Sequence, residues 1–401
     1  MSPDPINRGK VERSATSVLH LLMSDYRIDS RVRNETESLK NRGYEIDVFC
    51  LKSGVTKKTE LRNGVRIARF GIYSQHKIFH ILTAYLGFFY GAMRKNYRLV
   101  HAHDFTALPI GFLLSRLKKI PLIYDTHELW SESEHEDYPK RALTMAYQVE
   151  KYIAKRADRI ITVSDSINAF LRHYFQNPGI TTARNIPSYT FSRPSSILRE
   201  RYSIPGHVPI LIYQGAISKA RGVDTILRAV KKIRNIDFKF LLLGNGPYLT
   251  EVQKFIHENQ LESNILISGE VPQDELLRYL SSGDIGVHAI SNTCLNHQYC
   301  LPNKLFEYIH AGLCILCTNL KEMSQLVRKN ELGLTFADHD ADDLALKMRY
   351  LIEHRDEMDR FRSNAKRLNK CLTWDNEFVG VKNLYEELLH QEKHPENKKS
   401  S

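Results

Sequence analysis

Short apolar runs alternate with segments of helical periodicity along most of the chain. In the first half, the apolar runs lie at 18–23, 45–51, 99–101, 122–124 and 159–163. Amphipathic segments at about 31–41 and 143–157 lie between them. Strands that alternate with helices predict an α/β sheet whose parallel strands are joined by right-handed crossovers.

A second α/β series follows a stretch that breaks the pattern. Residues 185–196 are rich in proline, serine and tyrosine, which predicts a linker. The apolar runs of the second series lie at 209–213, 238–243, 264–268, 285–288 and 313–318. Two α/β sheets joined by a linker predict two domains, and ligands of such sheets bind beyond the carboxyl ends of the strands. We therefore expect a ligand cleft lined by the loops that follow the strands.

Composition agrees with this picture and adds a charge asymmetry. Of 401 residues, 42% are hydrophobic and 26% are charged, which is typical of a soluble protein of two domains. The formal net charge is +11, and residues 1–100 hold 18 Lys and Arg against 9 Asp and Glu. This excess favours an anionic partner, such as nucleic acid, an anionic lipid surface or a phosphate-bearing substrate, although a solvated basic face is the simpler alternative.

One apolar segment has two interpretations. Residues 78–93 (IFHILTAYLGFFYGAM) are apolar and aromatic, and Arg94, Lys95 and Arg98 follow at once. The segment is shorter than the roughly 20 residues that a membrane-spanning helix needs. It predicts either a buried core helix or a helix that lies at a membrane surface with basic flanks. A polar leader of 17 residues precedes the first apolar run, so we expect no signal peptide and a cytoplasmic location.

The six cysteines have no disulfide-framework spacing, which favours a reducing compartment. Cys314 and Cys317 fall on a predicted strand, where residues three apart point to opposite faces, so we expect core thiols rather than a redox pair. Cys294, His297 and Cys300 are close in sequence, but no fourth ligand with a recognisable zinc spacing accompanies them. We therefore predict no metal site.

The most informative segment is 301–312 (LPNKLFEYIHAG), which predicts a helix that begins near Asn303. Its unpaired N–H groups and positive dipole end would face a polar loop, and Lys304 adds a full charge there. Glu307 lies one turn later on the same face and could accept hydrogen bonds from the hydroxyls of a ribose. An incidental Lys–Glu pair on an amphipathic helix is the alternative, and only the surrounding residues can decide.

Polar residues follow several predicted strands in both halves of the chain. Lys219 or Arg221 on one side and Lys304 on the other would place cations around a diphosphate, which indicates nucleotide-sugar chemistry. The turn at 244–247 (GNGP) lacks the third glycine of a dinucleotide fingerprint, which counts against an NAD enzyme. The other strand-end candidates are Asp25, Arg27, Arg31, His103, Asp104, His127 and Gly215.

Together these residues resemble the retaining glycosyltransferases of family 4 from about residue 17 to 390. The motifs that carry the resemblance are, in order, DSRV (29–32), HAHD (101–104), YDTHE (124–128), ADRIITVSDS (157–166), ARNIP (183–187), YQGAISKARGVDTILRA (213–229), LLLGNGP (241–247), ISGEVPQDEL (267–276), GDIGVHAI (283–290) and LPNKLFEYIHAG (301–312). The resemblance implies an α/β fold of the GT-B type, with two Rossmann-like α/β/α domains that face each other across a cleft.

The resemblance also implies where each domain begins and ends. The N-terminal, acceptor-binding domain would be 1–190 and the C-terminal, donor-binding domain 197–372. A helix at 373–390 would return to the first domain, and 391–401 would be a disordered tail.

By the same resemblance, Arg221 and Lys304 would bind the donor's diphosphate, Glu307 its ribose, and the backbone near Val271 its base. His127 matches the family's active-site histidine, with Asp104 nearby. The remaining expected donor-site residues are Gly215, Lys219, Gly244, Tyr299, Leu301 and Asn303, and the expected acceptor-side residues are Asp25, Arg27, Arg31 and His103. The family generally needs neither a metal nor another cofactor.

Two departures from the family pattern indicate a subgroup with a P-x-K-x-x-E-Y motif. Tyr299 stands where many members have a second glutamate that contacts the sugar. The segment 24–27 (SDYR) stands where paired glycines often approach the diphosphate.

The resulting hypothesis is a retaining hexosyl transferase. It would use a UDP- or GDP-sugar donor and a glycan or lipid-linked acceptor in surface polysaccharide or glycoconjugate biosynthesis. Its partners would include no nucleic acid, and it could lie peripherally on the inner face of an anionic membrane. The alternatives are a nucleotide-sugar epimerase or hydrolase of the same fold, or a binding protein that kept the nucleotide-sugar site but lost transfer.

Overall fold

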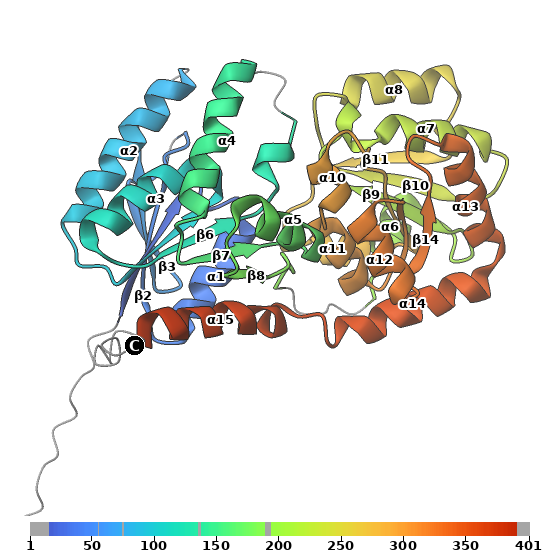
Figure 1. Cartoon of the computed structure of the whole chain (residues 1–401). Helices are drawn as coiled ribbons and strands as arrows, with labels where there is room; N and C mark the ends of the chain where they lie inside the picture. Colours follow the sequence, from blue (N-terminus) through green and yellow to red (C-terminus); the bar gives the residue numbers. More distant parts are fainter. Residues whose placement is uncertain (1–15, 55, 74–75, 135–137, 189–193, 391–401) are drawn as a thin grey trace, which may run out of the picture. The chain divides into compact units, whose positions relative to one another are not determined.

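The computed structural model describes residues 16–54, 56–73, 76–134, 138–188 and 194–390. It contains two β-sheets, one with the strand order β3-β4-β2-β1-β5-β6-β7-β8 and one with the order β11-β10-β9-β12-β13-β14 (Figure 1). The chain divides into two compact units: unit 1 is Met1–Tyr124 with Glu386–Ser401, and unit 2 is Asp125–Tyr385.

Unit 1 is built around β1, whose six residues are all buried. It pairs in parallel with β2 on one side and β5 on the other, while β3 and β4 form an antiparallel hairpin at the edge. The elements of this unit are β1 (Ser17–Leu22), α1 (Ser30–Asn41), β2 (Glu45–Leu51), β3 (Thr59–Arg62), β4 (Val65–Phe70), α2 (Lys77–Met93), β5 (Leu99–His103), α3 (Asp104–Lys118) and the first part of β6 (Leu122–Thr126).

Unit 2 begins with the end of β6 and continues with two strands of the first sheet and their helices. These are η1 (Trp130–Glu132), α4 (Lys140–Ala154), β7 (Arg159–Thr162), α5 (Asp165–Phe175) and β8 (Ile180–Thr182). Ser164 caps α5, because its hydroxyl accepts a hydrogen bond of 3.2 Å from the N–H of Ile167.

The second sheet lies entirely within unit 2, and its strand pairs are all parallel. Its elements are α6 (Ile197–Tyr202), β9 (Ile210–Gln214), η2 (Lys219–Arg221), α7 (Val223–Lys232), β10 (Lys239–Leu243), α8 (Leu249–Glu258), β11 (Ile265–Gly269), α9 (Leu276–Leu280), β12 (Ile285–His288), α10 (Leu295–Tyr299), α11 (Asn303–Ala311), β13 (Cys314–Thr318), α12 (Lys321–Lys329), β14 (Gly333–Phe336), α13 (Ala341–Glu353), α14 (Arg355–Asn369) and the first part of α15 (Trp374–His390).

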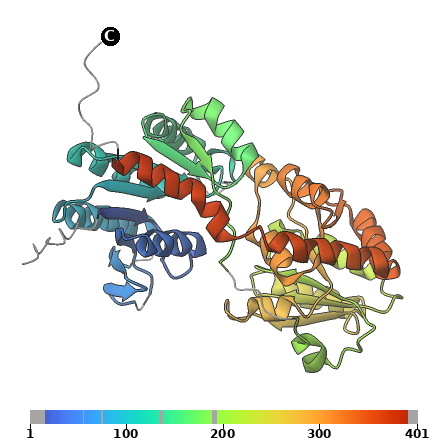
Figure 2. The same ribbon diagram turned by 90° about the horizontal axis from the view of Figure 1, so that it is seen from below.

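Helices cover both faces of this sheet (Figure 2). One apolar core joins the sheet to α7, α8 and α13, and the other joins it to α9, α11 and α12. Cys314 belongs to the first core and Cys317 to the second, so the prediction that these thiols point to opposite faces of a strand is confirmed. Alternate side chains of each strand enter different cores, so both faces of the sheet are buried. For this reason the central strands of the sheet are apolar along their whole length.

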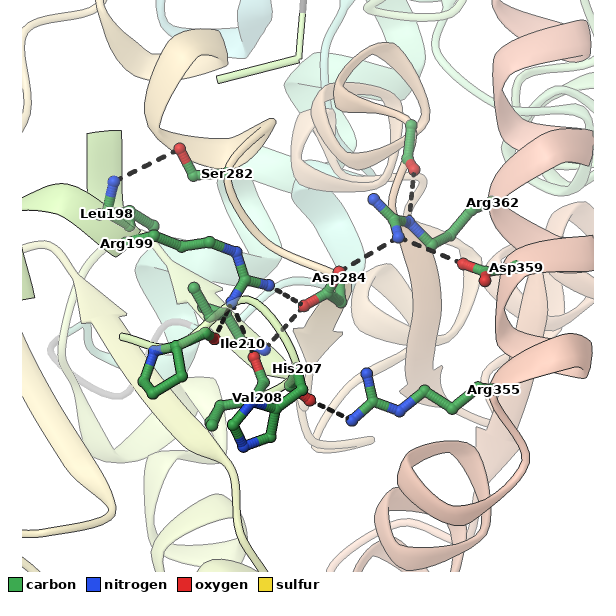
Figure 3. A network of polar contacts seen from close by, with 12 residues as sticks. Leu198, Arg199, His207, Val208, Ile210, Ser282, Asp284, Arg355, Asp359 and Arg362 are labelled. Carbon is green, nitrogen blue, oxygen red and sulfur yellow. Dashed lines mark hydrogen bonds and ion pairs between the residues drawn. The ribbon is translucent and has the colours of Figure 1, made fainter. Parts of the chain in front are cut away.

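A buried carboxylate fixes the start of β12 (Figure 3). Asp284 accepts hydrogen bonds from Arg199 of α6, at 3.0 Å, and from the N–H of Ile210, at 2.9 Å. Its other oxygen lies 3.1 Å from Nη1 of Arg362 on α14. One side chain thus ties two strands to two helices at the amino end of the sheet, away from the strand ends that carry the candidate site.

The fold confirms the two α/β series, and several predicted strands agree with the structure to within about two residues, the usual uncertainty of helix and strand ends. The sequence did not predict the β3–β4 hairpin, β8 or β14. The domain limits stay predictions, and α15 is continuous from Trp374 to His390. Residues 189–193 of the expected linker and the tail 391–401 lie outside the described residues.

Candidate active site

Three loops are joined by backbone hydrogen bonds at the carboxyl edge of the sheet in unit 2. The N–H of Gly215, after β9, donates to the carbonyl of Leu243, and the N–H of Gly244, after β10, donates to the carbonyl of Gly269, both at 2.9 Å. Gly244 has φ +149°, and a Cβ there would lie 1.9 Å from the carbonyl oxygen of Gly215. Only glycine allows this approach. A cavity of about 290 Å³ opens beside the loops, and its lining includes Gly215, Gly244 and Val271.

Lys304 lies directly over the first of these loops. A Cβ on Gly215 would be 2.3 Å from Cε and 2.9 Å from Nζ of Lys304, so the glycine makes room for the lysine. Burial lowers the pKa of Lys304, the charge of Arg221 lowers it further, and the carboxylate of Glu307 acts in the opposite direction. Two cations are therefore held near each other at a buried site, which an anionic ligand would stabilise.

The helix α11 begins at this site because Pro302 precedes it. Proline fixes φ at a value that suits the start of a helix, and the side chain of Pro302 offers no hydrogen bond to the first turn. The positive dipole end of α11 therefore lies beside Lys304. Glu307 lies one turn further along α11 and is buried. We expect a residue that contacts a ligand at this site to be buried.

A second cavity, of about 220 Å³, surrounds the start of α11. It brings together His127, Arg221, Leu301 and Asn303, four of the residues expected in the site. The other lining residues are Glu128, Val163, Ile167, Asn185, Ile290, Asn296, His297, Cys300 and Pro302. The cavity joins the loop after β6 to the loop before α11, so a histidine and a helix N-terminus share one space.

Two contacts hold the histidine loop in place. Nε2 of His127 lies 3.4 Å from Oδ2 of the buried Asp125, which orients the imidazole. Asn296 of α10 accepts a hydrogen bond of 2.8 Å from the N–H of Leu129, and its amide nitrogen lies 3.4 Å from the carboxylate of Glu128. The loop of residues 125–129 is thus fixed by one buried amide of α10.

Comparison with known proteins decides the family. The model of Glycosyl transferases group 1 matches residues 195–368, and that of Glycosyltransferase Family 4 matches residues 28–185. The chain is a GT-B glycosyltransferase. The two models together cover both α/β series, and the boundary between them falls in the proline-rich stretch.

Named relatives agree with this assignment. Alpha-D-kanosaminyltransferase of Streptomyces kanamyceticus is 22% identical over 290 residues, which are 66% of this chain and 71% of the relative. Alpha-monoglucosyldiacylglycerol synthase of Streptococcus pneumoniae is 20% identical over 334 residues, which are 78% and 73% of the two chains. The solved structure of Anabaena HepE in complex with UDP and glucose has a TM-score of 0.75 and 16% identity, and the match covers 93% of this chain and all of that one.

Four of the ten expected donor residues line neither cavity in the glycosyltransferase: Lys219, Tyr299, Lys304 and Glu307. The ring of Tyr299 lies 4.9 Å from the ammonium of Lys321 on α12, and its carbonyl accepts a hydrogen bond of 2.8 Å from the hydroxyl of Ser164. Lys219 is exposed on η2. The roles of Lys219 and Tyr299 toward a donor stay predictions, and the ring of Tyr299 has a partner on another helix.

The sequence did not identify His288 as a candidate. It ends β12 and is fully buried, and among the described residues neither of its ring nitrogens has a hydrogen-bond partner. Two residues earlier, a Cβ on Gly286 would lie 2.5 Å from the ring of Tyr308 on α11. Because alternate residues of a strand share a face, His288 also faces α11. The nearby charges of Lys304 and Arg221 lower its pKa further than burial alone does.

Unit 1 holds the expected acceptor-side residues, with different exposures. Asp25 and Arg27 form a bidentate ion pair, with Nη2 to Oδ2 at 2.7 Å, and the guanidinium is half exposed. Arg31 and His103 are fully buried. Asp104 begins α3 with φ +58°, a left-handed conformation that is uncommon outside glycine. The fold of unit 1 therefore presents Arg27 at its surface and encloses Asp25, Arg31 and His103.

Among the described residues of unit 1, those that could bind a metal are three buried histidines on β1 and β5 and the buried Glu35 of α1. The ligand atoms of His20, His101 and His103 lie within 4.8 Å of one another. However, Nδ1 of His20 and Nε2 of His103 share a hydrogen bond of 3.0 Å, and the rings of His101 and His103 stack at 4.4 Å. A metal would have to break that hydrogen bond. The expectation of a metal-independent enzyme stays a prediction.

Proposed function

We propose that this glycosyltransferase moves a sugar, with retention at the anomeric carbon, from a UDP- or GDP-sugar to a glycan or lipid-linked acceptor. The observation that carries the proposal is the position of Lys304. Its ammonium lies over the backbone of Gly215, beside Arg221 and the N-terminus of α11. Two cations and a helix dipole at the carboxyl edge of a parallel sheet suit a diphosphate.

The two cavities suit the two ends of such a donor. The cavity beside Val271 would take the base, and Glu307 would accept hydrogen bonds from the ribose hydroxyls. The cavity at the start of α11 would take the sugar, beside His127. Lys304 lies over Gly215, which lines the first cavity, and Arg221 lines the second cavity. The two cations are thus near the place where a diphosphate would join the base in the first cavity to the sugar in the second.

In the reaction, charge develops on the diphosphate as it leaves the sugar. Lys304, Arg221 and the N–H groups of α11 would stabilise that charge from fixed positions. Such electrostatic stabilisation is stronger in a buried site than in water. No divalent ion is required for this stabilisation. Asp125 would keep the imidazole of His127 aimed at the sugar. The UDP of the HepE structure and the sugar-transferring names of the relatives support this reading of the site.

Calorimetric titration with UDP and GDP tests the donor site. Lys304→Ala and Glu307→Ala should each weaken binding of the preferred nucleotide about tenfold to a hundredfold, because each removes a charged hydrogen-bonding partner worth about 1.5 to 3 kcal/mol. Lys254 and Glu258 form an exposed pair on α8, at 3.8 Å, and provide the matched controls Lys254→Ala and Glu258→Ala. Unchanged affinity in both site variants would reject the assignment of the site.

Release of free nucleotide from a nucleotide sugar separates the proposed function from its alternatives. A transferase releases nucleotide mainly when an acceptor is present. A hydrolase of the same fold releases it equally without an acceptor, while an epimerase changes the sugar and releases none. A binding protein that lost transfer binds the donor by calorimetry and does neither.

A further inference from the structure

The helix α2 is apolar around its whole circumference, although only one side of it is packed. On the inner side, Ala84 and Phe88 are fully buried. A Cβ on Gly87 would lie 2.4 Å from the side chain of Phe70, so the helix approaches the sheet closely there. One side of α2 is therefore a regular part of the core of unit 1.

The opposite side of α2 is exposed and has no charged residue between 78 and 93. We call its large apolar side chains, which are between 48% and 75% exposed, the outer stripe: Ile78, Phe79, Leu82, Leu86, Tyr90 and Met93. Most are three or four residues apart, so they share one face of the helix. A surface helix normally carries charged and polar residues on this face. An exposed apolar stripe of this kind marks a binding surface.

Exposed positive charge lies just beyond the C-terminal end of α2 and at the C-terminal end of α3. Between 77 and 119 the only acidic residue is Asp104, whereas the basic residues are Lys77, Arg94, Lys95, Arg98, Arg116, Lys118 and Lys119. Of these, Arg94, Arg98, Arg116 and Lys119 are exposed. The helix α3 packs beside α2 and adds two exposed leucines, Leu113 and Leu117 (Figure 1).

We propose that the outer stripe of α2 docks on an anionic lipid bilayer, with the helix lying in the plane of the membrane surface. The apolar side chains enter the boundary between headgroups and acyl chains, and the basic residues bind anionic headgroups. No described helix is long and apolar enough to cross a bilayer, and α2 has 17 residues. A second copy of the chain fits this face less well, because two basic rims would repel each other. The surface lies wholly in unit 1 and is independent of the donor site.

Flotation of the purified full chain with vesicles tests this surface. We expect binding to vesicles of phosphatidylcholine with phosphatidylglycerol and little binding to phosphatidylcholine alone. Because headgroup attraction is screened by salt, binding should fall markedly at about 0.5 M NaCl. The double variant Leu82→Gln with Leu86→Gln should lower the partition coefficient about tenfold or more, since it removes two inserted side chains.

Two exposed apolar residues outside the stripe provide the control. Leu346→Gln with Val379→Gln changes side chains of comparable exposure on α13 and α15 and should leave vesicle binding unchanged. Both double variants should keep the thermal unfolding temperature and the UDP affinity of the unmodified chain.

Several results would overturn the proposal. They are absence of vesicle binding, equal binding to neutral vesicles, and unchanged binding of the stripe variant. A concentration-dependent dimer that the stripe variant abolishes would assign the face to a second copy instead. If the unmodified chain bound neither UDP nor GDP, the proposed function would be rejected, while the membrane surface would be untouched.

Discussion

His127 is the residue whose geometry most directly concerns the reaction. Its imidazole lies in the cavity at the start of α11 and is oriented by Asp125. We expect His127→Ala to lower kcat about tenfold to a hundredfold, the value of one hydrogen bond to a charged or partly charged group. The affinity for UDP, which would bind through Lys304 and Glu307, should change by less than about twofold.

Steady-state release of UDP in the presence of acceptor, together with calorimetry, checks this prediction. His207 is an exposed histidine of unit 2, so His207→Ala should leave both quantities unchanged. Unmodified turnover in His127→Ala would remove this histidine from the reaction.

At the scale of residues, the sequence predicted charged side chains better than the contacts between them. Lys304 and Arg221 could be predicted because they lie at the start of a helix and in a loop after a strand, where an anion can bind, and Glu307 because it lies one turn after Lys304 on the same helix. Asn296 could not, because it contacts the backbone of a residue 167 positions away. His288 could not be predicted for a different reason. A histidine at the end of an apolar strand is indistinguishable from a core residue in the sequence until the facing helix is known.

At the scale of elements, the start of β12 depends on one carboxylate (Figure 3). Asp284 is buried and pairs with Arg199 and Arg362, so its removal leaves two guanidinium groups without their common partner. We expect Asp284→Ala to lower the free energy of unfolding by about 3 to 5 kcal/mol, as breaking a buried ion pair does. Urea denaturation measures the loss.

The same network offers a matched control. Asp359 also pairs with Arg362, at 3.3 Å, but its side chain is 63% exposed. Asp359→Ala should therefore cost less than about 1 kcal/mol. Equal losses for the two variants would show that burial of the network does not decide its contribution.

A second prediction at the scale of elements concerns the loop that joins β10 to α8. Gly244→Ala places a methyl group 1.9 Å from the carbonyl of Gly215, at a φ that alanine avoids, and so disturbs both loops beneath Lys304. We expect a loss of about 1 to 3 kcal/mol in unfolding free energy, with weaker UDP binding. Gly206→Ala is the control, because a Cβ there has no atom within 4 Å. Unchanged UDP affinity in Gly244→Ala would separate this loop from the donor site.

Alternation of strands with helices revealed most elements from the sequence, and two of the missed strands, β3 and β14, share a physical cause. The hairpin strand β3 (TELR) is polar and lies at the edge of its sheet, where solvent replaces one neighbour. The edge strand β14 begins at Gly333, whose φ of +153° places its Cα close to the carbonyl of Ile315. Neither strand has the apolar run that a buried central strand requires.

At the scale of the whole molecule, the two units perturb different titratable groups. Unit 2 buries His288 and His310, and burial lowers the pKa of each. The charges of Lys304 and Arg221 lower that of His288 further, whereas a hydrogen bond with Asn369 partly restores that of His310. Below about pH 6.5 the unfolded chain therefore binds protons at these histidines more readily than the folded chain does. Acid therefore lowers the free energy of unfolding of unit 2.

In unit 1, two carboxylates have lowered pKa values. A hydrogen bond from the hydroxyl of Ser17 is the largest influence that lowers the pKa of Glu45 to about 2. Burial raises the pKa of Asp25, but hydrogen bonds from Arg27 and Ser53 outweigh it and bring the value to about 2. A carboxylate with a lowered pKa stabilises the folded state above its unfolded pKa, near 4, and this stabilisation is lost as the pH falls from there toward 2.

Acid should therefore weaken unit 2 as the pH falls below about 6.5. Each neutral buried histidine contributes up to about 1.4 kcal/mol per pH unit below pH 6.5 to the loss. Hydrogen exchange of the full chain at about pH 7.5, 5.5 and 4 should show protection in the second sheet falling already between the two higher values. His288→Leu should reduce that first loss, because leucine does not titrate, and the exposed His207→Leu should not. Unchanged protection of the second sheet between the two higher pH values, or an identical pH profile for His288→Leu, would contradict the assignment of this transition to buried histidine.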